Sequence, residues 1–226
     1  MNYLFSDRFG GISKPPFDTL NLALHVEDNF DDVMQNRAIL SKKLRTKNLV
    51  FMEQVHGANV EIIVKAKSQT IPKCDAMITD IRDVALCVMV ADCIPVLLYD
   101  EDKEVIAVAH AGRNGVKLKI VNKTVGLMRD NFSCDIKDIK IIFGASIKSC
   151  CYEVKRDAIE GFKNYLHVED DRIYLDIVSK CVDDLKDMGI KEQNIEVSSV
   201  CTCCDRDYFS YRRDGQTGRF CGAIVL

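Results

Sequence analysis

Long apolar runs, a large excess of charge of one sign and low-complexity linkers are all missing from this sequence. Its longest apolar stretches, residues 85–91 and 94–99, are far too short to span a bilayer and are typical of buried strands. Charged Asp7 and Arg8 precede any apolar run long enough for a signal peptide. We therefore expect a cytoplasmic protein that neither crosses nor binds a membrane.

Charge gives no reason to expect a nucleic-acid partner. The chain has 31 Lys and Arg against 34 Asp and Glu, a formal net charge of −3. No basic patch that would attract a phosphate backbone stands out. Hydrophobic residues make up 47%, which is enough for one sizeable core. Since no Ser/Pro/Gly-rich stretch marks a linker, we expect a single domain over residues 1–226.

Short apolar runs alternate with a few helical patterns. Helical periodicity predicts helices over residues 28–44, 115–128, 156–165 and 177–188, the last ended by Gly189. Short runs rich in β-branched residues predict strands over residues 3–6, 49–52, 60–64, 76–79, 84–90, 95–99, 105–109, 139–143 and 195–200. This mixture indicates a mixed α/β (α+β) domain.

The 11 cysteines have a different meaning in a cytoplasmic chain than in a secreted one. Reduced thiols serve there as small buried hydrophobes, metal ligands or nucleophiles. Cys201 and Cys204 form a C-x-x-C pair, which is typical of a redox dithiol or of half a zinc site. The only candidate second half is Cys150-Cys151, and adjacent cysteines chelate one tetrahedral metal poorly. A structural role is the favoured interpretation.

Three of the chemically capable residues lie at the ends of predicted strands. His56 follows one strand and precedes Gly57, His110 closes another, and Cys93 lies in a break between two apolar runs. Two neutral imidazoles and one thiolate fill three tetrahedral positions on zinc and leave the fourth for water or substrate. Their wide spacing alone is also compatible with two hydrogen-bonded histidines and a buried thiol.

Several short motifs follow one another in an order that resembles a known family. They are residues 54–57 (QVHG), 75–80 (DAMITD), 91–97 (ADCIPVL), 109–112 (AHAG), 151–154 (CYEV) and 210–215 (SYRRDG), together with 8–13 (RFGGIS), 20–22 (LNL) and 36–37 (NR). Together they resemble the laccase-domain family, formerly called multicopper polyphenol oxidases and now regarded as purine nucleoside phosphorylases. The resemblance spans nearly the whole chain.

The resemblance implies a function and a metal site. It places the family's zinc ligands on His56, Cys93 and His110. It implies phosphorolysis of adenosine, inosine and guanosine, cleavage of methylthioadenosine and deamination of adenosine. It also implies a layered sandwich related to toxin deamidases that use a Cys-His pair. Copper is a weaker expectation than zinc, because several coppers would need many more ligands than four histidines.

Five residues are candidates for binding a purine nucleoside and phosphate. Phosphate requires cationic or N–H partners, and Arg8, Arg212 and Arg213 are the candidate cations. Without the family resemblance, each is more typical of a solvated or ion-paired surface arginine. Gln54 is either a pocket donor or a plain strand-end residue, and Asn21 is either a pocket residue or a turn residue.

One segment departs from the family pattern close to the expected zinc ligands. After residues 110–112 the family usually has Trp-Arg-Gly, whereas this chain has Arg113-Asn114-Gly115 and no tryptophan anywhere. Three function classes follow from the sequence as a whole. They are a zinc-dependent nucleoside enzyme, a cysteine hydrolase or deamidase with Cys93 as nucleophile and His110 as base, and a non-catalytic zinc-binding module.

Overall fold

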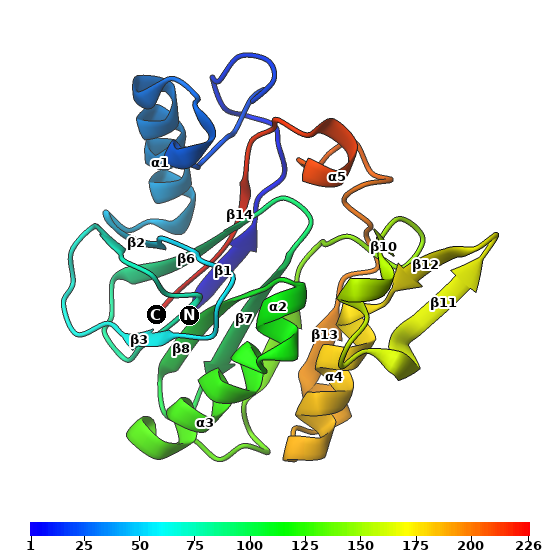
Figure 1. Ribbon diagram of the computed structural model, residues 1–226. Coiled ribbons are helices and arrows are strands. Elements are labelled where there is room, and N and C mark those ends of the chain that lie inside the picture. Colours follow the sequence, from blue (N-terminus) through cyan, green and yellow to red (C-terminus); the bar gives the residue numbers. More distant parts are fainter.

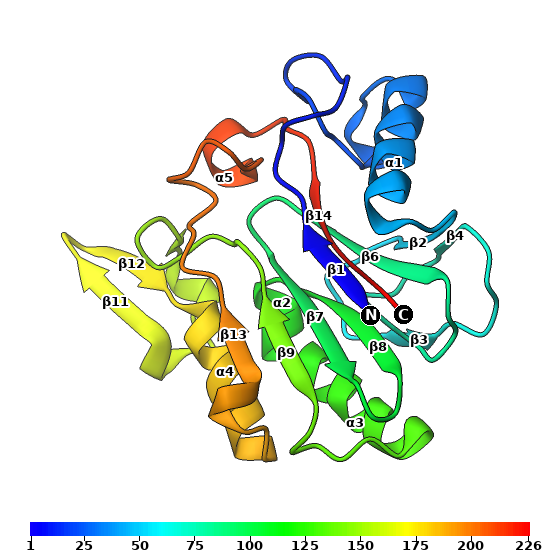
Figure 2. The ribbon, with the colours of Figure 1, turned by 180° about the vertical axis from the view of Figure 1, so that it is seen from behind.

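Two β-sheets lie face to face with helices on both outer sides (Figure 1, Figure 2). The computed structural model describes residues 1–226. The first sheet has the order β1-β14-β6-β2-β4, and the second has the order β13-β9-β7-β8-β5-β3. A small third sheet has the order β10-β12-β11. The strands are β1 (Asn2–Phe5), β2 (Asn48–Met52), β3 (Val60–Ile62), β4 (Gln69–Ile71), β5 (Ala76–Thr79), β6 (Val84–Val90), β7 (Ile94–Asp100), β8 (Val105–Ala111), β9 (Lys140–Phe143), β10 (Glu153–Val154), β11 (Leu166–Glu169), β12 (Arg172–Leu175), β13 (Ile195–Val197) and β14 (Phe220–Val225).

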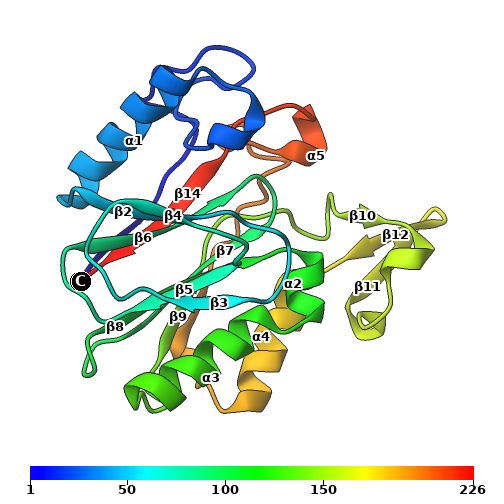
Figure 3. The same ribbon diagram turned by 60° about the vertical axis from the view of Figure 1, so that its left-hand side comes forward.

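The helices complete four layers. They are α1 (Phe30–Leu44), α2 (Arg113–Lys117), α3 (Ile120–Phe132), α4 (Ile177–Met188) and α5 (Tyr211–Asp214). In Figure 3, α1 lies on the outer side of the five-stranded sheet, whereas α3 and α4 cover the six-stranded one. None of these helices is long and apolar enough to cross a membrane. The result is the mixed α/β layered sandwich that the sequence predicts.

Strand β6 is apolar throughout because both of its faces are buried. Leu86 and Val88 point into the core between the two sheets, while Ala85 and Cys87 point into the core under α1. Side chains alternate between faces along a strand, so a strand covered on both faces must be apolar at every position. Strand β8 has the same character, and its polar exception, His110, is buried at the end of the strand.

Two of the predicted helices begin and end much as expected. In α1 the Asn29 side chain accepts hydrogen bonds from the N–H groups of Asp31 and Asp32, which caps the first turn. In α4 Gly189 adopts a φ of 105° at the C-terminal end, a conformation that glycine reaches without steric cost.

The prediction of one uninterrupted helix over residues 115–128 is wrong. The chain forms α2 and α3 instead, with Lys119 between them at a φ of 59°. The break lets α2 begin directly after β8, next to the cluster described below. The apolar residues of this segment are nevertheless buried, since Val116, Ile120 and Val121 belong to the core under the six-stranded sheet.

The helix predicted over residues 156–165 is also wrong. Only two short 3₁₀ turns form there, Arg156–Ala158 and Lys163–Tyr165. Gly161 lies between them at a φ of 86°, which no α-helix accommodates. The segment leads into the hairpin β11–β12, which the sequence analysis missed.

The predicted strands are all present within a few residues of their expected bounds, but five strands were missed. Four of them, β4, β10, β11 and β12, are short. The fifth, β14, lies between β1 and β6 in the first sheet, so the cysteine- and arginine-rich tail returns to the core (Figure 2). Its Phe220 and Ile224 are completely buried between the sheets.

Candidate active site

Three strand ends meet on one side of the six-stranded sheet, where neighbouring strands begin or end. Strands β7, β8 and β5 are neighbours and run antiparallel, so the starts of β7 and β5 and the end of β8 lie together. Cys93 immediately precedes β7, Asp75 immediately precedes β5, and His110 lies near the end of β8 opposite Pro95. His56 comes from the loop between β2 and β3. Residues distant in sequence are thereby brought to one point.

The three predicted metal ligands form a compact cluster. The ligand atoms of His56, Cys93 and His110 all lie within 4.8 Å of one another. The two imidazole rings have centroids 4.8 Å apart and are inclined at 78°. A Cβ on Gly112 would lie 2.9 Å from the Cys93 sulfur, closer than van der Waals contact allows. Glycine is therefore required at this position to make room for the cluster.

The buried carboxylate of Asp75 holds two of these residues in place. It accepts a hydrogen bond from Nδ1 of His110 at 2.9 Å and others from the backbone N–H groups of His56 at 2.9 Å and Gly57 at 2.7 Å. Burial acts to raise the pKa of Asp75, but the hydrogen bonds from His110 and Gly57 outweigh it and keep the pKa below its usual value. With Nδ1 held by the ionised Asp75, Nε2 is the ring nitrogen of His110 that remains for the hydrogen bond with Cys93.

The backbone of His56 is held in an uncommon conformation. Its φ of 56° lies in the left-handed region, which residues other than glycine adopt uncommonly. The hydrogen bonds to Asp75 fix the residue on its N–H side, and Nδ2 of Asn114 donates to its carbonyl oxygen at 2.6 Å on the other. Asn114, which departs from the family pattern, thus supports a cluster residue directly. The neighbouring Arg113 donates to the carbonyl of Ala158.

The electrostatics of the cluster favour a thiolate. Burial raises the pKa of Cys93, but the charge and hydrogen bond of His110 and then those of His56 lower it to about 6. Burial likewise lowers the pKa of His110, but the charge of Cys93 and the hydrogen bond to Asp75 raise it to about 9. A thiolate is the form of cysteine that binds metals and attacks electrophiles. The same arrangement can therefore hold a soft metal ion or activate a nucleophile.

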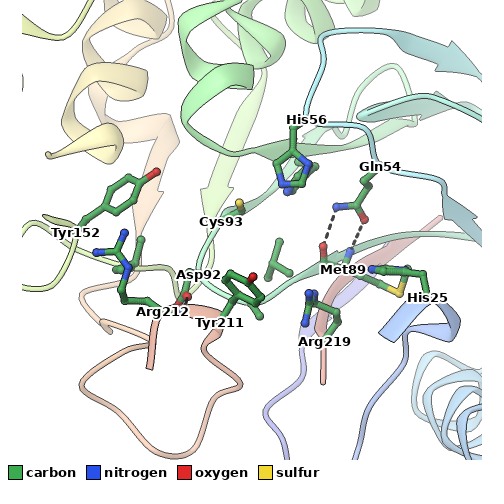
Figure 4. Close-up of a pocket in the computed structure, with 14 residues that line it drawn as sticks. His25, Gln54, His56, Met89, Asp92, Cys93, Tyr152, Tyr211, Arg212 and Arg219 are labelled. Atoms are coloured by element: carbon green, nitrogen blue, oxygen red, sulfur yellow. Dashed lines mark hydrogen bonds between the residues drawn. The ribbon is translucent and has the colours of Figure 1, made fainter. Parts of the chain in front are cut away.

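The cluster lines a cavity of about 410 Å³ at the edge where the two sheets face each other. The opposite wall is formed by three segments: the end of β6, helix α5, and the residue that directly precedes β14 (Figure 4). The lining residues are His25, Gln54, His56, Met89, Val90, Ala91, Asp92, Cys93, His110, Ile147, Tyr152, Tyr211, Arg212 and Arg219. We call this cavity the His/Cys pocket. Its volume is within the range of small-molecule sites.

Two arginines and two tyrosines face the cluster across the His/Cys pocket. The guanidinium of Arg212 lies 5.3 Å from the centre of the Tyr152 ring, and that of Arg219 lies 6.0 Å from the centre of the Tyr211 ring. Both guanidinium groups donate only to backbone carbonyls, Arg212 to Cys151 and Arg219 to Thr217 and Gly218. Burial lowers the pKa of Arg219, but the ordinary pKa of arginine is so high that the side chain stays cationic.

Asp92 connects the His/Cys cluster to the arginine wall, the opposite side of the pocket that carries Arg212 and Arg219. Its φ of 91° turns the chain sharply before Cys93. One carboxylate oxygen accepts from the Thr202 hydroxyl and the other from the N–H of Arg212, each at 2.7 Å. Asp92 therefore serves as a capping carboxylate for α5.

Among the predicted substrate residues, Gln54 and Arg212 line the His/Cys pocket. The Gln54 amide is held by two hydrogen bonds to the backbone of Met89, at 2.8 and 3.0 Å (Figure 4). Asn21 is completely buried, and its Oδ1 accepts a hydrogen bond from the N–H of Arg219, so it lies behind the pocket wall.

The structure does not bring Arg8 and Arg213 into the lining. Arg8 pairs with Asp18 at 3.1 Å and lies over the Phe209 ring. The Arg213 guanidinium donates to the carbonyls of Thr202, Cys203, Asp205 and Tyr208 and pairs with Asp214, which occupies its donors within its own loop.

Four lining residues of the His/Cys pocket were not among the predicted site residues: His25, Tyr152, Tyr211 and Arg219. Tyr152 and Tyr211 belong to matched motifs and could have been found there. His25 is one of only four histidines, which is a usable signal, whereas Arg219 lies beside a strand that went unrecognised.

Comparisons with known proteins agree over the whole chain. A family model described as multi-copper polyphenol oxidoreductase laccase matches residues 2–226. A Corynebacterium glutamicum protein named purine nucleoside phosphorylase is 36% identical, and the match covers 99% of this chain and 93% of that protein. A Streptomyces coelicolor protein of the same name is also 36% identical, over 98% of this chain and 94% of the relative.

Solved structures share the fold. The crystal structure of YlmD from Geobacillus stearothermophilus aligns with a TM-score of 0.94 at 30% identity, covering 99% of this chain and 90% of that one. The Bacillus licheniformis protein YfiH aligns with the same TM-score at 31% identity, covering 99% and 92%.

Proposed function

This chain belongs to the multi-copper polyphenol oxidoreductase laccase family, and on that premise we propose that it is a zinc-dependent purine nucleoside phosphorylase. The relatives that bear this name match it at 36% identity over nearly their full length. The observation that carries the proposal is the composition of the His/Cys pocket. A cluster of metal-ligand type faces two arginines that have no carboxylate partner.

The two arginines supply the site for phosphate. Arg8 and Arg213 pair with carboxylates, whereas Arg212 and Arg219 pair with none. A cation that lines a cavity without a counter-ion attracts an anionic ligand, and the guanidinium fork matches the geometry of phosphate oxygens. Arg212 therefore remains a phosphate-binding residue in this proposal, and Arg219 takes the place of Arg8 and Arg213.

The cluster fits zinc. A tetrahedral zinc ion holds imidazole nitrogen and thiolate sulfur at about 2.0 to 2.3 Å, so its ligand atoms lie about 3.3 to 3.8 Å apart. The ligand atoms of His56, Cys93 and His110 lie within 4.8 Å of one another, and Asp75 orients His110 from behind. A set of several coppers does not fit, because only three of the four histidines line the pocket.

The remaining pocket residues bind and orient the nucleoside. The Tyr152 and Tyr211 rings offer flat apolar surfaces for a purine. Burial and the neighbouring charge of Arg219 lower the pKa of His25, so its neutral imidazole accepts a hydrogen bond from a ribose hydroxyl. When bound, zinc would supply a Lewis acid on the side of the pocket opposite the arginines.

Phosphorolysis then depends on alignment. Arg212 and Arg219 hold phosphate so that one of its oxygens forms a bond to C1′ of the ribose while the C1′–N9 bond breaks. The electron pair of the broken bond leaves with the purine, which is released as free base after protonation, together with ribose 1-phosphate. Holding both reactants in one pocket lowers the entropic cost of their encounter.

Chromatography of purine nucleosides incubated with the purified protein tests the proposal. We expect free base and ribose 1-phosphate from adenosine or inosine only when phosphate is present. Metal analysis should find zinc that is lost from the His56→Ala and Cys93→Ala variants. Base release without phosphate dependence, or undiminished in His110→Ala, would remove the proposed role of the His/Cys pocket. Inosine formed from adenosine without phosphate would instead identify deamination, which the family resemblance also implies.

A second candidate function follows from the contact between Asp75 and His110. A cysteine, a histidine and a carboxylate that orients the histidine form the arrangement of a cysteine hydrolase or deamidase, as in the toxin deamidases that the resemblance names. In that case the activity would survive removal of metal by a chelator and would be abolished by alkylation of Cys93. Zinc bound without turnover of any nucleoside or amide substrate would indicate a non-catalytic module.

A further inference from the structure

Four cysteines gather at a second point outside the His/Cys pocket. Cys150 and Cys151 lie in the turn between β9 and β10, and Cys201 and Cys204 lie in the turn that follows β13. All four sulfur atoms lie within 4.8 Å of one another. None of the four lines the pocket, so the proposed reaction leaves them without a role. We call this group the four-cysteine cluster.

The distances match a tetrahedral metal better than a disulfide. With zinc–sulfur bonds of about 2.3 Å, the sulfur atoms of a tetrahedral site lie about 3.8 Å apart. The Cys204 sulfur is 3.7 Å from that of Cys150 and 3.3 Å from that of Cys151. A disulfide would join only one pair and leave two thiols beside it, and all of the cysteines are free.

Adjacent cysteines usually chelate one tetrahedral metal poorly, but the turn that contains Cys150 and Cys151 allows both to reach one point. Residues 149–151 form a turn, and this turn brings the sulfurs of both Cys150 and Cys151 to Cys204. The two segments are already joined by a backbone bridge between Ser146 and Cys201. The cluster is therefore assembled by the fold rather than by spacing along the sequence.

The surroundings suit a site with excess negative charge. Four thiolates around a divalent ion carry two net negative charges. The backbone N–H of Lys148 donates to the Cys201 sulfur at 3.5 Å. The Arg212 guanidinium donates to the carbonyl of Cys151, which places one cation beside the four-cysteine cluster. The Arg213 guanidinium, paired with Asp214, donates to the carbonyl of the neighbouring Cys203. No carboxylate belongs to the cluster, and an all-sulfur ligand set selects soft ions such as zinc.

We propose that Cys150, Cys151, Cys201 and Cys204 bind a second, structural zinc ion that joins the two turns behind the arginine wall of the pocket. Four protein ligands close such a site to substrate. One turn continues directly into Tyr152, and the other is tied to Asp92 through the Thr202 hydroxyl. The ion thereby fixes the wall that carries Arg212 without taking part in chemistry.

Zinc analysis of matched variants tests this second site independently of the proposed activity. We expect about two zinc ions per chain in the unaltered protein and about one in a Cys150→Ser/Cys204→Ser variant, one for each intact site. Cys203→Ser, which changes a neighbouring thiol outside the cluster, should retain both. A zinc content that the double variant leaves unchanged would overturn the proposal.

A variant with the first site removed keeps the test decisive if the cysteine variant does not fold. His56→Ala/Cys93→Ser leaves the four-cysteine cluster intact. Its cobalt-substituted form should show intense thiolate-to-cobalt charge-transfer absorption and tetrahedral ligand-field bands. Absence of these bands, iron in place of zinc, or a Cys151–Cys204 disulfide found by peptide mass spectrometry would each refute a zinc site there. Failure of nucleoside phosphorolysis would leave these spectra unaffected.

Discussion

The buried carboxylate of Asp75 accepts a hydrogen bond from Nδ1 of His110 at 2.9 Å while it also binds the backbone N–H groups of the His56 loop. One side chain thus fixes the ring of one cluster residue and the backbone of another. Four backbone and side-chain donors converge on an acid that is completely buried. Such a residue determines how well the cluster is organised before any metal or substrate binds.

Replacement of this acid should weaken metal binding. Asp75→Asn removes the charge that orients His110, and we expect zinc affinity to fall by about 10- to 100-fold. Competition with a chromophoric chelator measures the change. Asp80→Asn, at an exposed position beyond the same strand, should have no effect. Equal affinities in the two variants would contradict the role given to Asp75.

Crowding at Gly112 should displace the Cys93 sulfur. A Cβ there would lie 2.9 Å from this sulfur, so Gly112→Ala should reduce turnover by about 100-fold, the cost of a misplacement on the order of 1 Å. Steady-state rates and zinc content measure the effect. The control is Gly126→Ala in α3, where the nearest atom is 3.9 Å away and a stability gain of about 1 kcal/mol is expected.

Thiol reactivity should depend on pH in a way set by the two histidines. Because the interactions with His110 and His56 lower the pKa of Cys93 from 9.0 to about 6, its thiolate persists in metal-free protein at any pH above about 6. The rate of iodoacetamide labelling should therefore rise through pH 6 as the pH increases and fall as the pH drops below it. Mass spectrometry of the Cys93 peptide follows the reaction.

Two additions make that experiment interpretable. Added zinc should suppress labelling of Cys93 at every pH, since a metal-bound thiolate is shielded. In a His110→Ala variant the rise should move to higher pH, because the largest favourable interaction is gone. A labelling profile that is the same with and without His110 would disprove the electrostatic account.

Loss of the Arg219 guanidinium should weaken phosphate binding specifically. Hydrogen bonds to charged groups contribute about 1.5 to 3 kcal/mol each, so Arg219→Ala should raise the KM for phosphate by about 10- to 100-fold. Arg219→Lys keeps the charge without the fork and should recover only part of the loss. Arg129→Ala removes an exposed arginine paired with Asp130 and should leave the KM unchanged. An equal rise in the KM for nucleoside would argue against a phosphate site.

The sequence by itself determined nine of the fourteen strands and pointed to the three cluster residues. The runs of β6 and β8 are apolar at nearly every position because both of their faces are buried, and that pattern is visible without a structure. His56, Cys93 and His110 were recognisable because they lie at or near the ends of predicted strands and within ordered motifs. The apolar pattern predicts the strands directly, whereas the choice of these three residues rests on the family resemblance of the motifs.

Only the tertiary structure decided which further residues share the site. Arg219 lines the pocket because β14 returns to pair with β1 and β6, a contact between distant segments that no local pattern encodes. Arg213 lies one position from Arg212, yet its donors are occupied by carbonyls of its own loop. The four cysteines converge because two turns pack together. Local periodicity reports burial, whereas proximity between distant residues depends on sheet order, and that is settled only when the whole core packs.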